Sequence, residues 1–309
     1  MLFSRVLKRA ALLALAIAGV ASTAVAAPRA FTAKDMAMLD RAADPRLSPD
    51  GRFLVWDVRS TDWAGNKSTH ALWLLDSRTP AMAPRRLGVS EKGATSPRWS
   101  PDGRRLYFLS SRAGSQQLWR TDSDGAEAVQ VTNLPVDVAS YRIAPDGKAI
   151  VVALEVFPDC ADLACTRARL DARKAGGVSG ATHDRLPFVI WDTWRARTLA
   201  HLFTLRLDDA GAASAAPIPL MKDFDADGPT RPFGDDADFA IVGGRVIFTA
   251  LPPGMAWGSD FQGRLYAAPL DGSAAPAPLG PTAPGSYGAP TPRPARSATT
   301  PTSRSSAVG

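Results

Sequence analysis

The chain has 309 residues and a formal net charge of +6, from 36 Lys and Arg against 30 Asp and Glu. The excess lies at the two ends, since residues 1–26 and 278–309 each carry three basic and no acidic side chains. The segment between them is neutral and has no basic stripe, which excludes the electrostatic footprint of a nucleic-acid-binding protein.

Residues 1–26 have the pattern of an export signal. Basic residues precede an apolar run at 10–20, and Ala24-Val25-Ala26 supplies the small residues of a cleavage site. The apolar run is shorter than the roughly 20 residues of a membrane-spanning helix, and an uncleaved anchor is the alternative. We therefore expect a periplasmic or secreted chain that begins at Ala27 and has no membrane association after cleavage.

A four-residue motif recurs three times at intervals of 52 and 44 residues. The copies are Ser48-Pro49-Asp50-Gly51, Ser100-Pro101-Asp102-Gly103 and Ala144-Pro145-Asp146-Gly147. Proline presets its φ angle for a turn, aspartate can bond its own backbone, and glycine adopts a positive φ at little cost. The motif therefore predicts a tight turn between two strands, and the intervals are typical of propeller blades.

Runs of β-forming residues follow each copy. The second strands are expected at 52–56, 104–109 and 148–153. Third strands are expected at 71–76 and 117–122, and fourth strands at 85–87 and 128–132. Four strands per unit is the pattern of a propeller blade, and nearly continuous apolar runs suit strands buried between neighbouring blades.

The third unit is interrupted by an insertion, which we place at 157–185. The strands expected after it lie at 186–192, 201–207, 238–249 and 264–270. The last two belong to a fourth, degenerate blade in which Gly243-Gly244 replaces the usual turn. The sequence thus predicts an all-β fold, a partial propeller of about four four-stranded blades over residues 27–277.

Residues 278–309 consist mainly of Pro, Ala, Ser, Thr, Gly and Arg, a composition that cannot bury a core. Two explanations stay open for this segment. One is a natural disordered tail. The other is a shifted reading frame near residue 278, because the break falls where a fifth blade should begin.

Cys160 and Cys165 are the two cysteines of the chain. In an exported protein such a close pair favours a local disulfide, with two free thiols as the alternative. A metal site is disfavoured because zinc usually takes four ligands and no histidine lies beside the pair. We expect no metal and no cofactor.

Other residues capable of chemistry lack the partners that a site requires. The histidines are His70, His183 and His201, and the sequence nominates no nucleophile beside them. Residues 223–228 resemble the opening of a calcium loop, but Gly234 stands where the bidentate glutamate would be. We expect structural or solvated histidines and a polar loop. The tryptophans, including Trp191 and Trp194 beside the insertion, are expected to pack.

Several stretches outside the turns carry a further likeness. They are 31–35 leading into 44–51, 156–160, 166–171, 184–187 before 191–194, 201–203, and 256–257 ahead of 265–266. These stretches resemble the N-terminal propeller of exported dipeptidyl- or acylaminoacyl-peptidase-like members of the prolyl oligopeptidase family, over about residues 30–275. The resemblance implies a propeller that limits access of large proteins to a serine peptidase active site in a following α/β-hydrolase domain.

Two features of that family are missing from the sequence. No G-x-S-x-G nucleophile motif occurs, so no catalytic residue can be assigned. Glu91, Glu127 and Glu155 are not adjacent, so the paired glutamates that hold the substrate amino terminus in dipeptidyl-peptidase relatives cannot be assigned either.

We therefore expect the non-catalytic portion of a serine peptidase, inactive as an isolated chain, with peptides or a hydrolase domain or chain as partners. A stand-alone TolB-like propeller that binds a periplasmic protein or peptide is the alternative. A subunit that assembles with a separately encoded hydrolase chain is a third reading.

Overall fold

The computed structural model describes residues 29–79, 83–177, 189–190, 193–194, 198–229, 235–254 and 263–280. The expected export signal and nearly all of the expected tail lie outside these ranges. The chain divides into two units, Met1–Leu39 and Asp40–Gly309. None of the helices in the described ranges has the length and apolar character to cross a membrane.

The first unit contains the short helix α2 (Ala33–Met38). Thr32 precedes it, and its hydroxyl accepts a hydrogen bond from the Asp35 amide at 3.2 Å. The Asp35 carboxylate in turn accepts a bond from the Thr32 amide at 2.8 Å, which completes a capping box. Arg29 also pairs with Asp35, so this carboxylate anchors the start of the helix.

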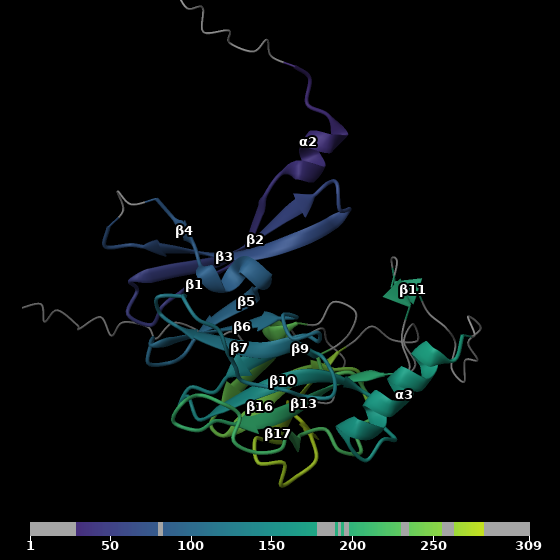
Figure 1. Ribbon diagram of the computed structural model, residues 1–309. Coiled ribbons are helices and arrows are strands. Elements are labelled where there is room, and N and C mark those ends of the chain that lie inside the picture. The colour runs from purple at the N-terminus through teal and green to yellow at the C-terminus, as the bar shows by residue number, and fades with distance from the viewer. Residues whose placement is uncertain are drawn as a thin grey trace, which may run out of the picture. The chain divides into compact units, whose positions relative to one another are not determined.

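The second unit contains four antiparallel sheets of four strands each among the described residues (Figure 1). Blade 1 consists of β1 (Arg41–Leu47), β2 (Phe53–Asp62), β3 (Lys67–Asp76) and β4 (Arg85–Arg86). Blade 2 consists of β5 (Thr95–Trp99), β6 (Arg105–Ser110), β7 (Gln117–Asp122) and β8 (Val129–Gln130). Blade 3 consists of β9 (Val138–Ile143), β10 (Ala149–Val156), β13 (Leu199–Arg206) and β14 (Ile218–Pro219). Blade 4 consists of β15 (Phe239–Val242), β16 (Arg245–Ala250), β17 (Arg264–Pro269) and β18 (Ala277–Pro278). The predicted all-β fold of about four blades is confirmed.

Each copy of the repeated motif forms the turn between the first and second strands of a blade. The Ser48 hydroxyl donates to the Asp50 carboxylate at 2.6 Å and accepts from the Phe53 amide at 2.8 Å. The copy that begins at Ser100 has the same two contacts. The copy that begins at Ala144 has no hydroxyl, but the Asp146 carboxylate accepts a bond from the Lys148 amide at 2.9 Å, as the Asp50 carboxylate does from the Arg52 amide. All three turn glycines have φ close to +70°, a region that glycine adopts without strain.

The described residues form three hydrophobic cores between consecutive blades. Blades 1 and 2 share one core, blades 2 and 3 a second, and blades 3 and 4 a third. In β10, Ile150 and Val152 face blade 2 whereas Val151 and Ala153 face blade 4, because successive side chains of a strand point to opposite faces. This explains the nearly continuous apolar sequence of β10.

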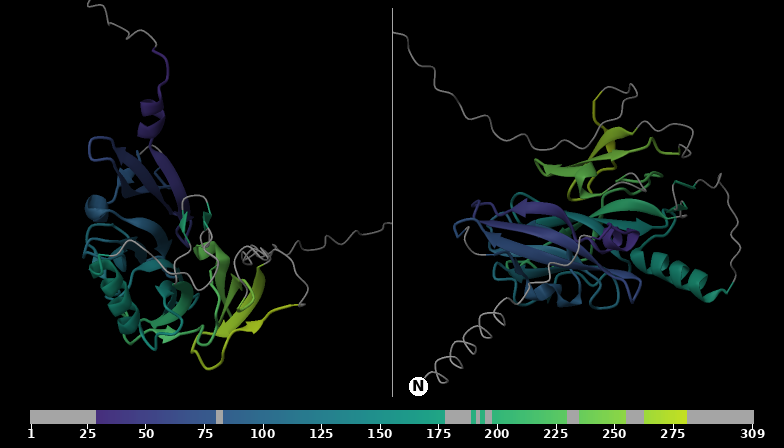
Figure 2. Two further views of the ribbon diagram at one scale, coloured as in Figure 1. Left: turned by 90° about the vertical axis from the view of Figure 1, so that its right-hand side faces the viewer. Right: turned by 90° about the horizontal axis from the view of Figure 1, so that it is seen from above.

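The insertion in blade 3 contains the helix α3 (Leu163–Ala175), which the sequence analysis did not predict. The Asp162 carboxylate caps it by accepting a bond from the Cys165 amide at 2.7 Å. Leu163 and Leu170 pack against the core between blades 2 and 3. Figure 2 shows α3 outside the four sheets in both of its views.

Two strand assignments differ from the sequence analysis. β11 (Val189–Ile190), expected to resume blade 3, instead pairs with β12 (Thr193–Trp194) in a separate two-stranded sheet. Both edges of β10 are already paired, with β9 and with β13, so β11 cannot pair with β10. Pro278, expected in the tail, ends β18, where proline is tolerated because an edge strand needs no outward N–H.

Two short 3₁₀ turns complete the described elements. The first is η1 (Gly88–Lys92), after blade 1, and the second is η2 (Asp236–Asp238), which leads into β15. Asp235 caps η2 by accepting a bond from the Ala237 amide at 2.6 Å. This cap fixes Asp236 at the entrance to blade 4.

Candidate functional site

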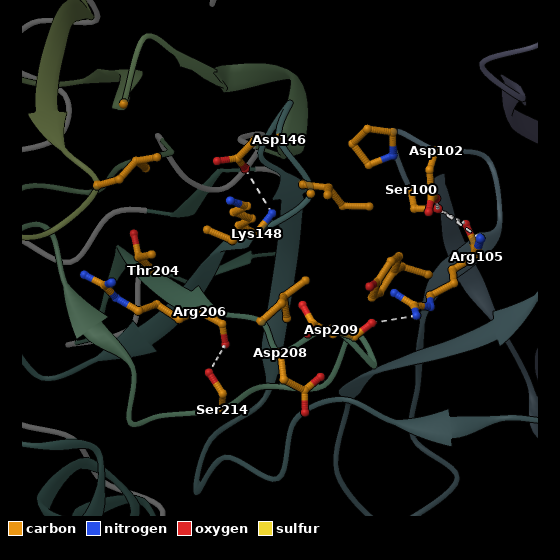
Figure 3. A pocket seen from close by; sticks show the side chains of 18 of the residues that line it. Ser100, Asp102, Arg105, Asp146, Lys148, Thr204, Arg206, Asp208, Asp209 and Ser214 are labelled. Carbon is orange, nitrogen blue, oxygen red and sulfur yellow. Dashed lines mark hydrogen bonds between the residues drawn. The ribbon is translucent and has the colours of Figure 1, made fainter.

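A cavity of about 900 Å³ lies at the end of the blades where the second and third repeat turns are found (Figure 3). Ser100 and Asp102 come from the turn of blade 2, and Asp146 comes from the turn of blade 3. Arg206, at the end of β13, and Asp271, after β17, complete its wall. The repeat turns, predicted as connections, thus also line a cavity.

The cavity contains charged groups of both signs. Its charged lining residues are Asp102, Arg105, Asp146, Lys148, Arg206, Asp208, Asp209 and Asp271. Hydrogen bonds from the Ser100 hydroxyl and the Arg104 amide hold the pKa of Asp102 below its usual value. The Arg105 guanidinium donates to the Asp209 carbonyl at 2.8 Å. Such a lining can bind polar, charged groups of either sign.

Among the described residues, the lining contains no histidine or cysteine, so these residues supply no Ser–His or Cys–His pair. The hydroxyl of Thr204, a residue with 3% exposure, is buried without a hydrogen-bond partner in the described part of the chain.

The two histidines within the described ranges lie in different surroundings. The Nδ1 atom of His70 lies 2.9 Å from the Asp57 carboxylate, whose pKa is raised because burial disfavours its charge. His201 is 7% exposed, and burial lowers its pKa to about 4. Among the described residues no hydroxyl or thiol hydrogen-bonds to either ring. His183 lies outside the described residues.

The acidic loop at 223–228 packs against blade 3. The Asp227 carboxylate accepts a hydrogen bond from the Ala200 amide at 2.9 Å, and Phe224 and Ala226 belong to the core between blades 3 and 4. No group of three or more potential metal-ligating side chains occurs in the described part of the chain. The side chains of this loop thus contribute to packing and to backbone hydrogen bonding.

Cys160 and Cys165 form a disulfide with a Cα–Cα distance of 5.6 Å. It closes the turn that leads into α3, beside the capping residue Asp162. Neither cysteine is among the described residues that line the cavity. Its place in the fold is structural.

A second group of charges lies on the first strands of the blades. Arg46, Arg98 and Arg142 each stand two residues before a copy of the repeated turn. The Arg98 guanidinium donates two bonds to the Asp236 carboxylate, at 2.7 and 3.1 Å, and one to Asp44 at 2.5 Å. These contacts connect β1, β5 and η2, and thereby join three blades.

The pKa values of two arginines of this group shift in opposite directions, since burial lowers that of Arg142. Burial alone would lower the pKa of Arg98, but hydrogen bonding and attraction to Asp236 outweigh it and raise the pKa. The Arg142 Nε donates to the backbone carbonyl of Asp236, and Arg46 lies 2.6 Å from Asp44. This cluster was not predicted from the sequence, although an arginine at one fixed position of the repeat indicated it.

No protein-family model matches the sequence. Dipeptidyl-peptidase 5 of Porphyromonas endodontalis is 27% identical over 197 residues, which are 63% of this chain and 27% of that protein. Dipeptidyl-peptidase 5 of Porphyromonas gingivalis is 24% identical over 211 residues, 65% of this chain and 28% of that protein. The predicted resemblance to peptidases of the prolyl oligopeptidase type is confirmed.

The uncharacterized peptidase YuxL of Bacillus subtilis is 33% identical over 127 residues, 41% of this chain and 19% of that protein. The chain therefore spans less than a third of the length of these peptidases. An acylaminoacyl peptidase of Pyrococcus horikoshii has a TM-score of 0.52 at 13% identity, over 82% of this chain and 34% of its own. An acylaminoacyl peptidase in complex with Z-Gly-Gly-Phe-chloromethyl ketone gives 0.54, also at 13% identity, over 80% and 33%. At these identities the structural likeness shows the propeller fold alone.

Proposed function

We propose that this chain is the substrate-gating propeller portion of a serine peptidase of the prolyl oligopeptidase type, and that it hydrolyses no peptide by itself. The observation that carries the proposal is the match to dipeptidyl-peptidase 5, which covers 63% of a chain built of propeller blades. The parent activity would be dipeptidyl or acylaminoacyl peptide hydrolysis.

Two features of the described residues support a non-catalytic role. The larger cavity has neither histidine nor cysteine in its wall, and neither described histidine hydrogen-bonds to a hydroxyl or thiol. Nucleophilic hydrolysis needs an activated nucleophile beside a base. The chain therefore supplies the access and binding part of the reaction, and the nucleophile is expected on a hydrolase domain or a partner chain.

Export is the second part of the proposal. The basic, apolar and small-residue order of residues 1–26 and the disulfide of Cys160 with Cys165 both suit an oxidising compartment. We place the protein in the periplasm or outside the cell. The mature protein recovered from there should begin at Ala27 on N-terminal sequencing, and an intact Met1 would contradict cleavage.

The experiment that tests the gating role starts with the gene region that follows this chain, translated in all three frames. Further blades and a G-x-S-x-G motif are expected there or in a neighbouring reading frame. The chain alone should leave a chromogenic dipeptide substrate uncleaved, whereas the chain joined to that hydrolase region should cleave it and spare large folded proteins. Cleavage by the purified chain alone would contradict the proposal, and a downstream region without a hydrolase would favour a stand-alone binding propeller.

A further inference from the structure

The three repeat arginines line a second cavity, of about 270 Å³. They are Arg46, Arg98 and Arg142, and the Asp236 carboxylate lies among them. We propose that this cavity binds a carboxylate group attached to an apolar group, as at the C-terminal residue of a peptide. The proposal concerns the propeller itself and does not depend on whether a peptidase domain accompanies it.

At ion-pair distance the cluster has more positive than negative charge. Three guanidinium groups pair with two carboxylates, those of Asp44 and Asp236, and the Asp235 carboxylate acts on Arg142 from farther away. Arg98 uses four of its five N–H donors, since it donates two bonds to Asp236, one to Asp44 and one to the Pro97 carbonyl. The remaining positive charge therefore belongs to the two other arginines.

Those two arginines retain unused hydrogen-bond donors. The Arg46 Nε is buried without a hydrogen-bond partner in the described residues, which is costly for a charged group. The Arg142 Nε donates to the Asp236 carbonyl, whereas its terminal nitrogen lies 3.8 Å from the Asp236 carboxylate, beyond hydrogen-bond length. The Arg46 Nε is closed to solvent, so a ligand in the cavity would contact Arg46 through the rest of its 42% exposed side chain and Arg142 through its terminal nitrogen. The planar fork of a guanidinium matches a carboxylate well.

The walls of the cavity indicate what else the ligand carries. Each repeat arginine is followed by an apolar residue that lines the same cavity: Leu47, Trp99 and Ile143. Leu47 has 59% exposure, so its side chain is accessible to an apolar group of a ligand in the cavity. A carboxylate joined to an apolar side chain fits both the charges and the walls better than an inorganic anion does.

The inference also explains why the arginine occupies one position in three blades. A residue two places before the turn lies near the end of the first strand, and the first strands of blades 1, 2 and 3 all contribute to this cavity. Repetition thus brings three equivalent arginine side chains to one place. Asp236, in the turn η2 that leads into blade 4, contributes a negative charge that pairs with them.

Calorimetric titration of the purified chain with N-acetyl-leucine and with N-acetyl-leucinamide tests the proposal. The acid should bind at least about tenfold more tightly than the amide, because only the acid offers a charged acceptor. N-acetyl-Ala-Ala-Leu and its amide form a second pair, and tighter binding of the tripeptide acid would identify a peptide terminus as the source. Equal affinities of acid and amide, or no binding of either acid, would overturn the proposal.

Variants locate the site. Arg142→Gln should weaken binding of N-acetyl-leucine by about tenfold, the usual order for loss of one charge-assisted contact. Arg167→Gln removes the same charge from α3, where Arg167 pairs with Asp171, and should leave binding unchanged. Equal losses in the two variants would show a general charge effect and would contradict the site.

Leu47→Ser keeps the proposal testable if Arg142→Gln disturbs folding, because it leaves every ion pair of the cluster in place. It should weaken binding of N-acetyl-leucine and leave binding of acetate unaltered. Inorganic phosphate should compete poorly, since it cannot contact the apolar walls. Unchanged affinity in Leu47→Ser, or phosphate binding as tight as that of N-acetyl-leucine, would reject the apolar part of the ligand.

Discussion

Blades 1 and 3 begin with the same kind of turn but differ in how deeply their strands are buried. In blade 3, nearly every residue of β10 and β13 is buried. In blade 1, β2 and β3 alternate between buried and half-buried positions, and their ends are exposed or half-exposed. Blade 3 shares a core with each of two neighbours, whereas blade 1 contributes to one core. The number of covered faces, and not the turn motif, therefore decides the burial of a blade.

The sequences of the two blades reflect this difference. The run Ala149–Val156 is apolar at all but one position, which suits a strand covered on both faces. The strand Phe53–Asp62 becomes polar after its midpoint and carries Asp57 at a buried position, paired with His70. A blade that shares a core with one neighbour can contain such polar residues, because part of each of its faces stays near water.

The largest effect expected from this comparison is that of a cavity in blade 3. Leu154 is fully buried in the core between blades 2 and 3, whereas Leu54, on β2, is half-buried. Leu154→Ala should lower the free energy of unfolding by about 4 kcal/mol, and Leu54→Ala by about 1 kcal/mol or less. Urea unfolding of the two variants, monitored by tryptophan fluorescence, gives both values. Equal losses would mean that the second covered face adds nothing to stability.

The blades could be predicted because their signals are local. A proline, an aspartate and a glycine define each turn, and the apolar runs behind it define strands, so the order of elements follows from short stretches of sequence. The same reasoning failed at Val189–Ile190, whose apolar character suited a strand but could not reveal that β10 already pairs with β13. Pairing partners are chosen by tertiary context.

The arginine cluster shows the same limit for the candidate site. Arg98 and Asp236 are 138 residues apart, and no local pattern predicts their contact. The position of Arg46, Arg98 and Arg142 before each turn was nevertheless visible as a repeat. A repeated charged residue on the first strand of successive blades is a signal for a shared cavity, because equivalent positions of adjacent blades converge.

A smaller effect concerns the histidines of the two blades. His201, on β13, is buried with a pKa of about 4, because burial outweighs the carbonyls of Phe224 and Ala226 and the charge of Asp225, which raise it. The unfolded chain binds this proton at the ordinary pKa of 6.5, so the folded state should lose stability as the pH falls from about 6.5 to about 4, by about 3 kcal/mol. Urea unfolding at pH 7 and pH 4.5 measures the difference.

The variant His201→Gln isolates this contribution. Glutamine keeps a hydrogen-bond donor but does not titrate, so the loss of stability between pH 7 and pH 4.5 should be smaller in the variant than in the unaltered chain. His70 is the comparison residue for burial: its side chain is 34% exposed and has a carboxylate partner, whereas that of His201 is buried. A loss that is the same with and without His201 would assign the pH dependence to other groups.

The smallest effect should come from the insertion of blade 3, which has no counterpart in the tight β2–β3 turn of blade 1. The disulfide between Cys160 and Cys165 closes a very short loop, and chain entropy gives it about 2 kcal/mol at most. Replacing both cysteines by serine should speed amide hydrogen exchange in α3, because the disulfide no longer holds the start of the helix where Leu163 and Leu170 pack against the core. Exchange in β2 and β3 should be unchanged. Reduction of the unaltered chain should reproduce this pattern. Faster exchange in blade 1 as well would show that the bond stabilises the whole array of blades, and the insertion would then have to be treated as part of the propeller core.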